Sequence, residues 1–164
     1  MKSIIITFIF RAILVLWLYI SSLQPWTKIF FITTLDNIKN LAIKEKGLAK
    51  NDLYQKYDKI LDTFSYFIIL EIIKKESLLS LEKITVLTII FCFRFFGIIL
   101  YLFSKNRKIL FYTSDLFREI LLLFYFTNKN HCYWFIIILI IKLIIEYHFH
   151  YIKGGLSSLI NKIW

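Results

Sequence analysis

Glycine, proline and cysteine are scarce in this sequence of 164 residues, which contains four, one and two of them respectively. So few glycines exclude most phosphate-cradling Gly-rich loops, and neither a nucleophile elbow nor an HExxH zinc motif occurs in the sequence. Cys92 falls in the middle of one hydrophobic segment and Cys132 at the edge of another. Sulfur atoms at such different depths rarely meet, so we expect two free thiols rather than a disulfide.

Alanine and valine are also rare, with three and two residues against 32 isoleucines and 17 phenylalanines. Isoleucine, phenylalanine, lysine, asparagine and tyrosine have AT-rich codons, whereas alanine, glycine, valine and proline have GC-richer ones. This usage indicates an AT-rich genome.

What the sequence has in excess is apolar residues, which make up 59% of it. A soluble domain usually contains about 45–50%. The excess is gathered into segments of the length that crosses a bilayer, about 17–25 residues. The sequence therefore predicts an all-α integral membrane protein, with residues 1–164 forming a single transmembrane domain. We expect a bundle of four to five transmembrane helices plus short interfacial amphipathic helices, with candidate spans at 3–20, 60–81, 84–103, 109–126 and 133–152.

Two of these spans depart from a simple uncharged apolar run. Residues 3–20 resemble a signal peptide, but Arg11 divides the apolar run and no cleavage site follows, which favours a retained anchor. The apolar run 60–73 rises only about 21 Å as a helix, less than the roughly 30 Å of hydrocarbon. It reaches Leu81 only if Lys74 and Lys75 extend their charges toward the headgroups. The number of spans, four or five, stays open for that reason.

The longest polar stretch covers residues 27–59 and is basic and amphipathic. Thr34 can cap a helix through about Lys46, and Gly47 can end it. Asn51 can cap a second helix that should run without a break into the next hydrophobic segment. The pattern fits either a helical region on the membrane surface or a solvated loop. The tail 156–164 is expected to form a short interfacial helix.

The formal net charge is +10, and the lysines flank the hydrophobic segments. This distribution indicates contact with anionic lipid headgroups and no nucleic-acid binding. Lysine and arginine are most numerous on the side of residues 27–59, so the positive-inside rule places that region in the cytoplasm and the N-terminus outside. If 60–81 does not cross, the C-terminus moves from the cytoplasmic side to the outside.

Charged side chains inside the spans are the most informative feature. A charge at the membrane centre costs about 2.5–3.5 kcal/mol, so unpaired charges would be expensive. Near balance of sign indicates that they pair inside a bundle. Residues 109–126 are too polar to insert without partner helices. The charged residues within spans are Arg11, Arg94, Arg118, Lys142, Asp62, Glu71, Asp115, Glu119 and Glu146.

Some of these residues share a helix face. Asp115 lies three and four positions before Arg118 and Glu119, and Lys142, Glu146 and His150 recur every four residues. Gly97 lies one turn after Arg94, where a neighbouring helix can approach closely. We therefore predict a buried charged cluster composed of Arg94, Asp115, Arg118, Glu119, Lys142, Glu146 and His150.

Such a cluster has two interpretations: a salt-bridge network that fixes helix pairing, or a route for protons or a small solute. Small size and the lack of a catalytic motif favour a non-enzymatic structural or accessory component of a membrane assembly, with other membrane subunits or further copies as partners. The alternative is a small transporter or channel, and a further alternative is a small membrane-embedded enzyme. His131 and His148 lie about 25 Å apart along a helix, and His148 and His150 point to different sides, so no metal or other cofactor is predicted.

Overall fold

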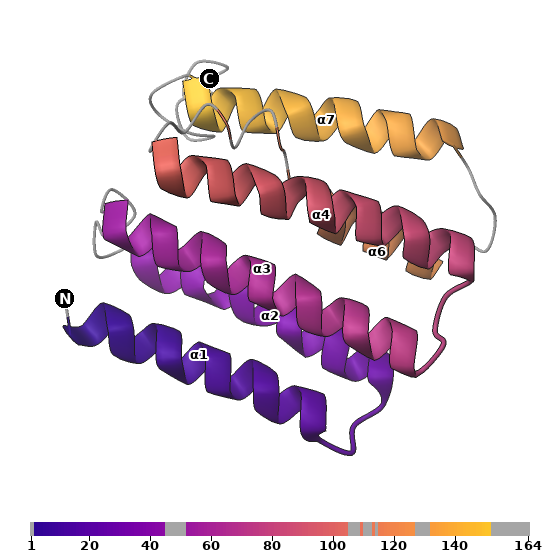
Figure 1. Cartoon of the computed structure of the whole chain (residues 1–164), viewed down its shortest axis with the longest axis horizontal. Coiled ribbons are helices and arrows are strands. Elements are labelled where there is room, and N and C mark those ends of the chain that lie inside the picture. Colours follow the sequence, from indigo (N-terminus) through magenta and orange to yellow (C-terminus); the bar gives the residue numbers. More distant parts are fainter. Residues whose placement is uncertain are drawn as a thin grey trace. The chain divides into compact units, whose positions relative to one another are not determined.

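The chain is all-helical in the part that the computed structural model describes, which comprises residues 2–44, 52–104, 109, 113, 115–126 and 132–151 (Figure 1). This confirms the predicted helical class. Six helices and no strand occur in these ranges: α1 (Lys2–Ile20), α2 (Pro25–Lys44), α3 (Asp52–Lys75), α4 (Leu81–Ser104), α6 (Phe117–Phe126) and α7 (Cys132–Tyr151).

The chain divides into two compact units, Met1–Thr88 and Ile89–Trp164. In the first unit, α1, α2 and α3 pack side by side, each against the other two. The ring of Phe8, early in α1, lies 5.6 Å from the ring of Tyr54, early in α3. Tyr19, late in α1, lies against Lys75, at the end of α3, so these two helices run in the same direction. The short connection 21–24 returns α2 in the opposite direction. Buried apolar residues of this unit include Val15, Leu18, Ile29, Ile32, Ile69 and Ile73.

α2 begins nine residues earlier than the Thr34 start that the sequence suggested. Proline lacks a backbone N–H, and an N–H in the first turn of a helix would have no intrahelical partner. Proline is therefore favoured at this position, and α2 begins at Pro25. The Thr34 hydroxyl does not cap a helix; it donates to the carbonyl of Phe30, 2.7 Å away, as threonine does inside a helix. Gly47 and Asn51, the predicted end and cap, lie outside the described residues.

α3 runs unbroken from Asp52 to Lys75, which confirms that the second polar helix continues into the hydrophobic segment. Its 24 residues rise about 36 Å, more than the hydrocarbon thickness. The helix does not extend to Leu81. Ser77 adopts the left-handed conformation with φ of 48°, and the amides of Ser77 and Leu78 donate to the carbonyls of Lys74 and Ile73. This is a Schellman motif, which ends a helix.

α4 and α7 match the predicted spans 84–103 and 133–152 within a few residues. The predicted span 109–126 is different, because it is not one helix. Asp115 and Leu116 are non-helical, and α6 starts at Phe117. α6 and α7 pack against each other in the second unit. The prediction of an uninterrupted helix over 109–126 is therefore wrong.

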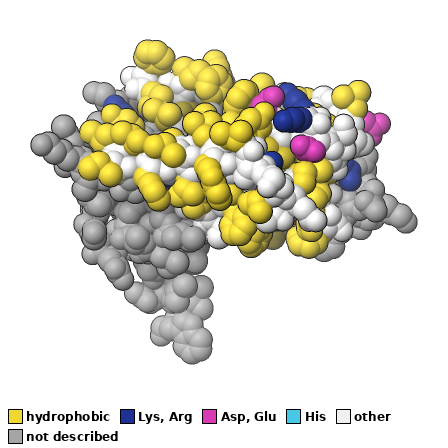
Figure 2. Space-filling view, turned by 90° about the horizontal axis from the view of Figure 1, so that it is seen from below, with side chains coloured by type: hydrophobic (Ala, Val, Ile, Leu, Met, Phe, Trp, Pro, Cys, Tyr) yellow, Lys and Arg dark blue, Asp and Glu magenta, His cyan; other side chains and the backbone are white. Residues whose placement is uncertain are grey.

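α4 is the one helix of the described ranges that is long and apolar enough to cross a membrane, judged by length and composition. Only 28% of its most apolar stretch is buried. Large apolar side chains are exposed on other helices as well, and Figure 2 shows a face on which hydrophobic side chains predominate. The tail 156–164 lies outside the described residues.

Candidate functional site

Charged side chains occupy buried positions in both units. Arg11, Lys28, Asp62, Arg94 and Asp115 are each at most 9% exposed. A buried charge is tolerated when it is paired or hydrogen-bonded, so the partners of these groups indicate what they do.

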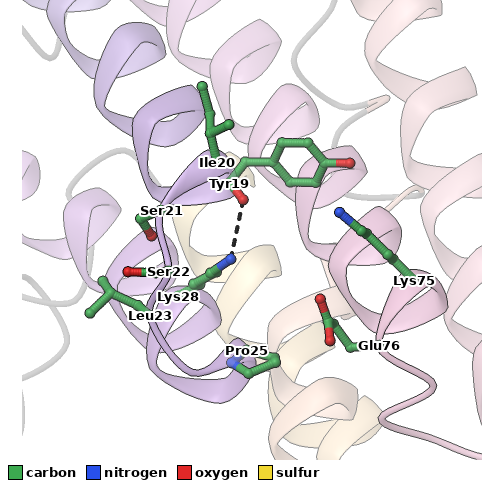
Figure 3. Close-up of a pocket in the computed structure, with 9 residues that line it drawn as sticks. All are labelled: Tyr19, Ile20, Ser21, Ser22, Leu23, Pro25, Lys28, Lys75 and Glu76. Carbon is green, nitrogen blue, oxygen red and sulfur yellow. Dashed lines mark hydrogen bonds between the residues drawn. The ribbon is translucent and has the colours of Figure 1, made fainter.

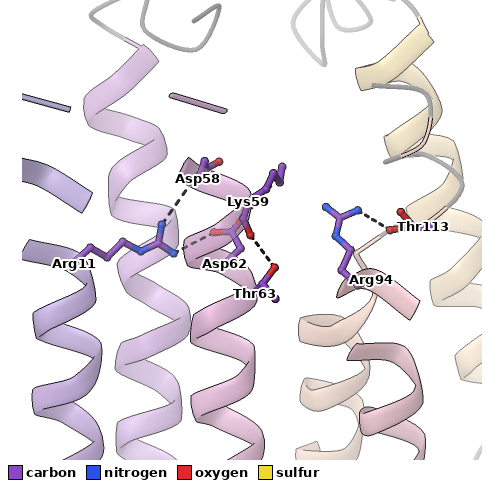
Figure 4. A network of polar contacts seen from close by, with 7 residues as sticks. All are labelled: Arg11, Asp58, Lys59, Asp62, Thr63, Arg94 and Thr113. Carbon is purple, nitrogen blue, oxygen red and sulfur yellow. Dashed lines mark hydrogen bonds and ion pairs between the residues drawn. The ribbon is translucent and has the colours of Figure 1, made fainter. Parts of the chain in front are cut away.

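In the first unit, Arg11 of α1 reaches two carboxylates of α3 (Figure 4). Its Nη2 donates to Oδ1 of Asp62 at 3.2 Å, and its Nη1 lies 3.7 Å from Oδ1 of Asp58. Lys59 approaches the other oxygen of Asp62 at 3.7 Å. We call Arg11, Asp58, Lys59 and Asp62 the Arg11 cluster. It contains two positive and two negative charges, so its members neutralise one another while they join α1 to α3.

The predicted cluster did not include these four residues. Two sequence signals point to them: Arg11 and Asp62 have opposite signs within hydrophobic segments, and Asp58 lies four residues before Asp62 on the same helix face. A single sequence does not identify which of several acids pairs with a given arginine, and here the partner is 51 residues away.

In the second unit, Arg94 of α4 donates from Nη1 to the backbone carbonyl of Thr113 at 2.6 Å (Figure 4). Gly97, one turn later, lies directly against the side chain of Thr113. A Cβ at position 97 would overlap that side chain, so glycine is what permits the approach. Thr113 is a turn residue two positions before the non-helical Asp115. The arginine therefore supplies a hydrogen-bond donor to backbone at a break in a hydrophobic segment.

The second polar contact of this unit joins α6 to α7. Nζ of Lys142 donates to Oε1 of Glu119 at 2.8 Å, with side-chain exposures of 15% and 30%. Both side chains project from helices whose other residues are mostly apolar. A charge-assisted hydrogen bond of this length is among the stronger polar contacts in proteins, so it fixes the pairing of two short or weakly packed elements.

The structure brings together only some residues of the predicted cluster. Lys142 contacts Glu119, and Arg94 donates to the Thr113 carbonyl. Asp115 is buried at the interruption, and Arg118 is partly buried on α6. The side chains of Glu146 and His150 lie outside those described. Convergence of all seven residues on one interior stays a prediction.

Metal binding has no support in the described side chains, among which no group of three or more His, Cys, Asp or Glu residues could hold an ion. Cys92 is an exposed free thiol on α4. The geometry of the charged residues is suited to holding helices together.

Comparison with protein-family models, with curated proteins and with solved structures finds no match for this chain.

Proposed function

We propose that this chain is a multi-pass membrane protein that acts as a non-enzymatic structural or accessory component of a membrane assembly. The observation that carries the proposal is an inverted distribution of side chains. Many large apolar side chains are exposed along the helices, whereas the charged side chains of Arg11, Lys28, Asp62, Arg94 and Asp115 are buried.

The apolar exterior is extensive. In the described ranges, 30 large hydrophobic side chains are exposed and 19 hydrophobic side chains are buried. Trp17, Ile89 and Phe103 are 59%, 64% and 85% exposed. A monomeric soluble protein rarely exposes large continuous apolar patches, because water solvates them poorly. Lipid chains, or the apolar helices of partner subunits, would cover this surface.

The exposed face of α7 gives a specific example. Ile136, Ile137, Ile140, Ile141 and Ile144 are all at least 41% exposed, and they recur at helical spacing. Lys142, between them in sequence, turns to Glu119 of α6 instead. A helix whose charge faces a neighbouring helix and whose isoleucines face outward fits a bilayer better than water.

The pairing of the charges supports a structural role over a conduction route. The Arg11 cluster is internally neutral, and Lys142 is matched by Glu119. A proton or solute route needs polar groups along a continuous passage. Among the described residues, the Arg11 cluster joins α1 to α3 and the Lys142–Glu119 pair joins α6 to α7, so these contacts hold helices together within one unit.

The packing of α2 bears on the topology. If α1, α2 and α3 all cross the membrane in alternating directions, the connection 45–51 lies on the side richest in lysine, and the N-terminus lies on that same side. The positive-inside rule then puts the N-terminus in the cytoplasm rather than outside.

Native purification in a mild detergent tests the proposal. We expect the tagged chain to stay in membranes after carbonate extraction and to migrate on native gels with subunits of different sequence. Release by carbonate would contradict the membrane assignment. Purification as a chain without other subunits would contradict the accessory role.

Transport is the second candidate, and the interruption at Asp115 and Leu116 favours it. Transporters use discontinuous helices at their binding sites, with polar backbone buried in protein. Asp115→Asn tests this function in liposomes. Transport requires a measurable proton or solute flux in the wild type that this variant loses at equal protein content.

A further inference from the structure

A polar cavity of about 400 Å³ lies at one end of the first unit (Figure 3). It is formed where α1 ends, α2 begins and α3 ends. Lys28 of α2 and Lys75 of α3 both line it, and Figure 3 shows their ammonium groups directed toward the same space. The other lining residues are Tyr19, Ile20, Ser21, Ser22, Leu23, Pro25 and Glu76.

Lys28 is the deeper of the two lysines, with only 9% of its surface exposed. Its Nζ donates to the backbone carbonyl of Tyr19 at 3.2 Å. A carbonyl is a neutral partner, and an ammonium has three N–H donors. Among the described residues the structure records no ion pair for Lys28. Its buried positive charge therefore favours an anionic partner inside the cavity.

Lys75 is held at the cavity by an aromatic ring. Its Nζ lies 5.9 Å from the centre of the Tyr19 ring, within the range of a cation–π contact. Lys74, the preceding residue, points elsewhere, because successive helical residues differ by about 100° around the axis. It pairs with Glu71 at 3.7 Å and does not line the cavity.

Two further groups favour negative charge at this place. The N-terminus of α2, at Pro25, carries the positive end of the helix dipole. Ser22 places a hydroxyl-bearing residue in the lining. Glu76 opposes them, and its carboxylate reduces the net positive charge of the cavity.

We propose that this cavity binds a phosphate group, presented by the headgroup of a membrane phospholipid. Two lysines and a helix N-terminus match the oxygens of a phosphate. The cavity lies where helices end, which is the depth of headgroups if the unit spans a bilayer. The lipid source thus rests on the membrane assignment proposed above, whereas the phosphate chemistry does not.

The test uses the full chain purified in neutral maltoside detergent, with dioleoylphosphatidylglycerol as the probe and native mass spectrometry as the readout. Lys75→Gln should weaken lipid binding about ten-fold, the loss expected for one charge-assisted contact. Lys28→Gln should weaken it similarly. Lys74→Gln is the matched control, because it removes the same charge from the adjacent position, and it should change binding less than roughly two-fold. Glu76→Gln should strengthen binding.

Competition separates the two sources of phosphate. Retention of the lipid in the presence of millimolar inorganic phosphate supports a headgroup site. Displacement of the lipid by inorganic phosphate, with the same dependence on Lys75, keeps the phosphate site and rejects the lipid as its source. Equal binding by Lys75→Gln and Lys74→Gln overturns the proposal. Lys75 is exposed, so this variant keeps the fold even if Lys28→Gln does not.

Carbonate extraction of the same variants keeps the two proposals distinguishable. A chain that stays in the membrane and binds lipid equally with and without Lys75 rejects the site and leaves the membrane assignment intact. A chain released by carbonate rejects the membrane assignment, and its affinity for inorganic phosphate still decides the site.

Discussion

Lys142 of α7 donates a 2.8 Å hydrogen bond to Glu119 of α6, and this contact joins two helices whose other side chains are mostly apolar. α6 has only ten residues, of which Phe117, Ile120 and Leu121 are buried, so the Lys142–Glu119 contact adds a polar link to a short apolar interface. The pair is a direct polar link between α6 and α7.

Removal of one charge from this pair should destabilise the second unit. Lys142→Met leaves the partly buried Glu119 carboxylate without its cation, at an expected cost of about 2 kcal/mol, below the value for a fully buried pair. The measurement is the thermal unfolding temperature in detergent, together with the amount of protein in the membrane. The exchanged variant, Glu119→Lys with Lys142→Glu, should recover part of the loss. No recovery would show that the charges do not act as a pair.

Arg11 should be more sensitive than Lys142 because its cluster is more deeply buried. The side chains of Arg11 and Asp62 are 7% and 8% exposed, and loss of one partner of such a pair costs about 3–5 kcal/mol. Arg11→Met should therefore reduce accumulation strongly, whereas Arg11→Lys should keep part of it. Ile9→Met, at a 55% exposed position two residues away, is the control. Normal accumulation of Arg11→Met would argue against a structural role for the cluster.

Gly97 should not tolerate a methyl group. Its Cβ would overlap the side chain of Thr113, and overpacking of this kind costs about 1–3 kcal/mol. We expect Gly97→Ala to lower the unfolding temperature, and Gly97→Ala with Thr113→Gly to recover it, because the overlapping atoms all belong to Thr113. Phe96→Leu, at the exposed neighbouring position, should have little effect. An unchanged unfolding temperature for Gly97→Ala would contradict this packing.

Cys92 provides a test of the membrane assignment. Its thiol is exposed on α4, so water would leave it reactive, whereas lipid would shield it. In a Cys132→Ser background we expect a membrane-impermeant maleimide to leave Cys92 unlabelled in open membrane fragments and to label it after denaturation in dodecyl sulfate. Rapid labelling without denaturation would place this face of α4 in water.

The position of the N-terminus tests whether α2 crosses the membrane. With three crossings by α1, α2 and α3, an N-terminal epitope should lie on the cytoplasmic side, together with residues 45–51. We expect protease added to sealed, right-side-out vesicles to leave the epitope intact and to remove it after permeabilisation. Digestion in sealed vesicles would instead agree with α1 as a crossing followed by a cytoplasmic surface region.

The hydrophobic pattern was enough to locate α4 and α7, since long apolar runs bounded by polar residues define such helices within a few positions. It failed at α2, where Pro25 opens a helix of mixed composition that is held by packing against α1 and α3. It also failed at the break before α6. The donor that satisfies the Thr113 carbonyl comes from Arg94, 19 residues earlier, and local pattern carries no information about so distant a partner.

The contacts of the buried charged residues were also predictable only in part. Opposite charges within spans indicated pairing, and the Glu119–Lys142 contact agrees with that inference. The choice of partners was not predictable, because several acids were available to each base. Arg11 lies 51 residues before Asp62, so the pair depends on the assembly of the three-helix unit.

The separation between Arg11 and Asp62 has a consequence for synthesis of the chain. A ribosome adds about 5–20 residues per second, so the arginine emerges roughly 3–10 s before its carboxylate partner. During that interval the positive charge of Arg11 in the first helix has no Asp62 carboxylate with which to pair. The nascent chain is therefore exposed to quality control until α3 arrives. Translation speed between these two codons should set the yield of folded protein.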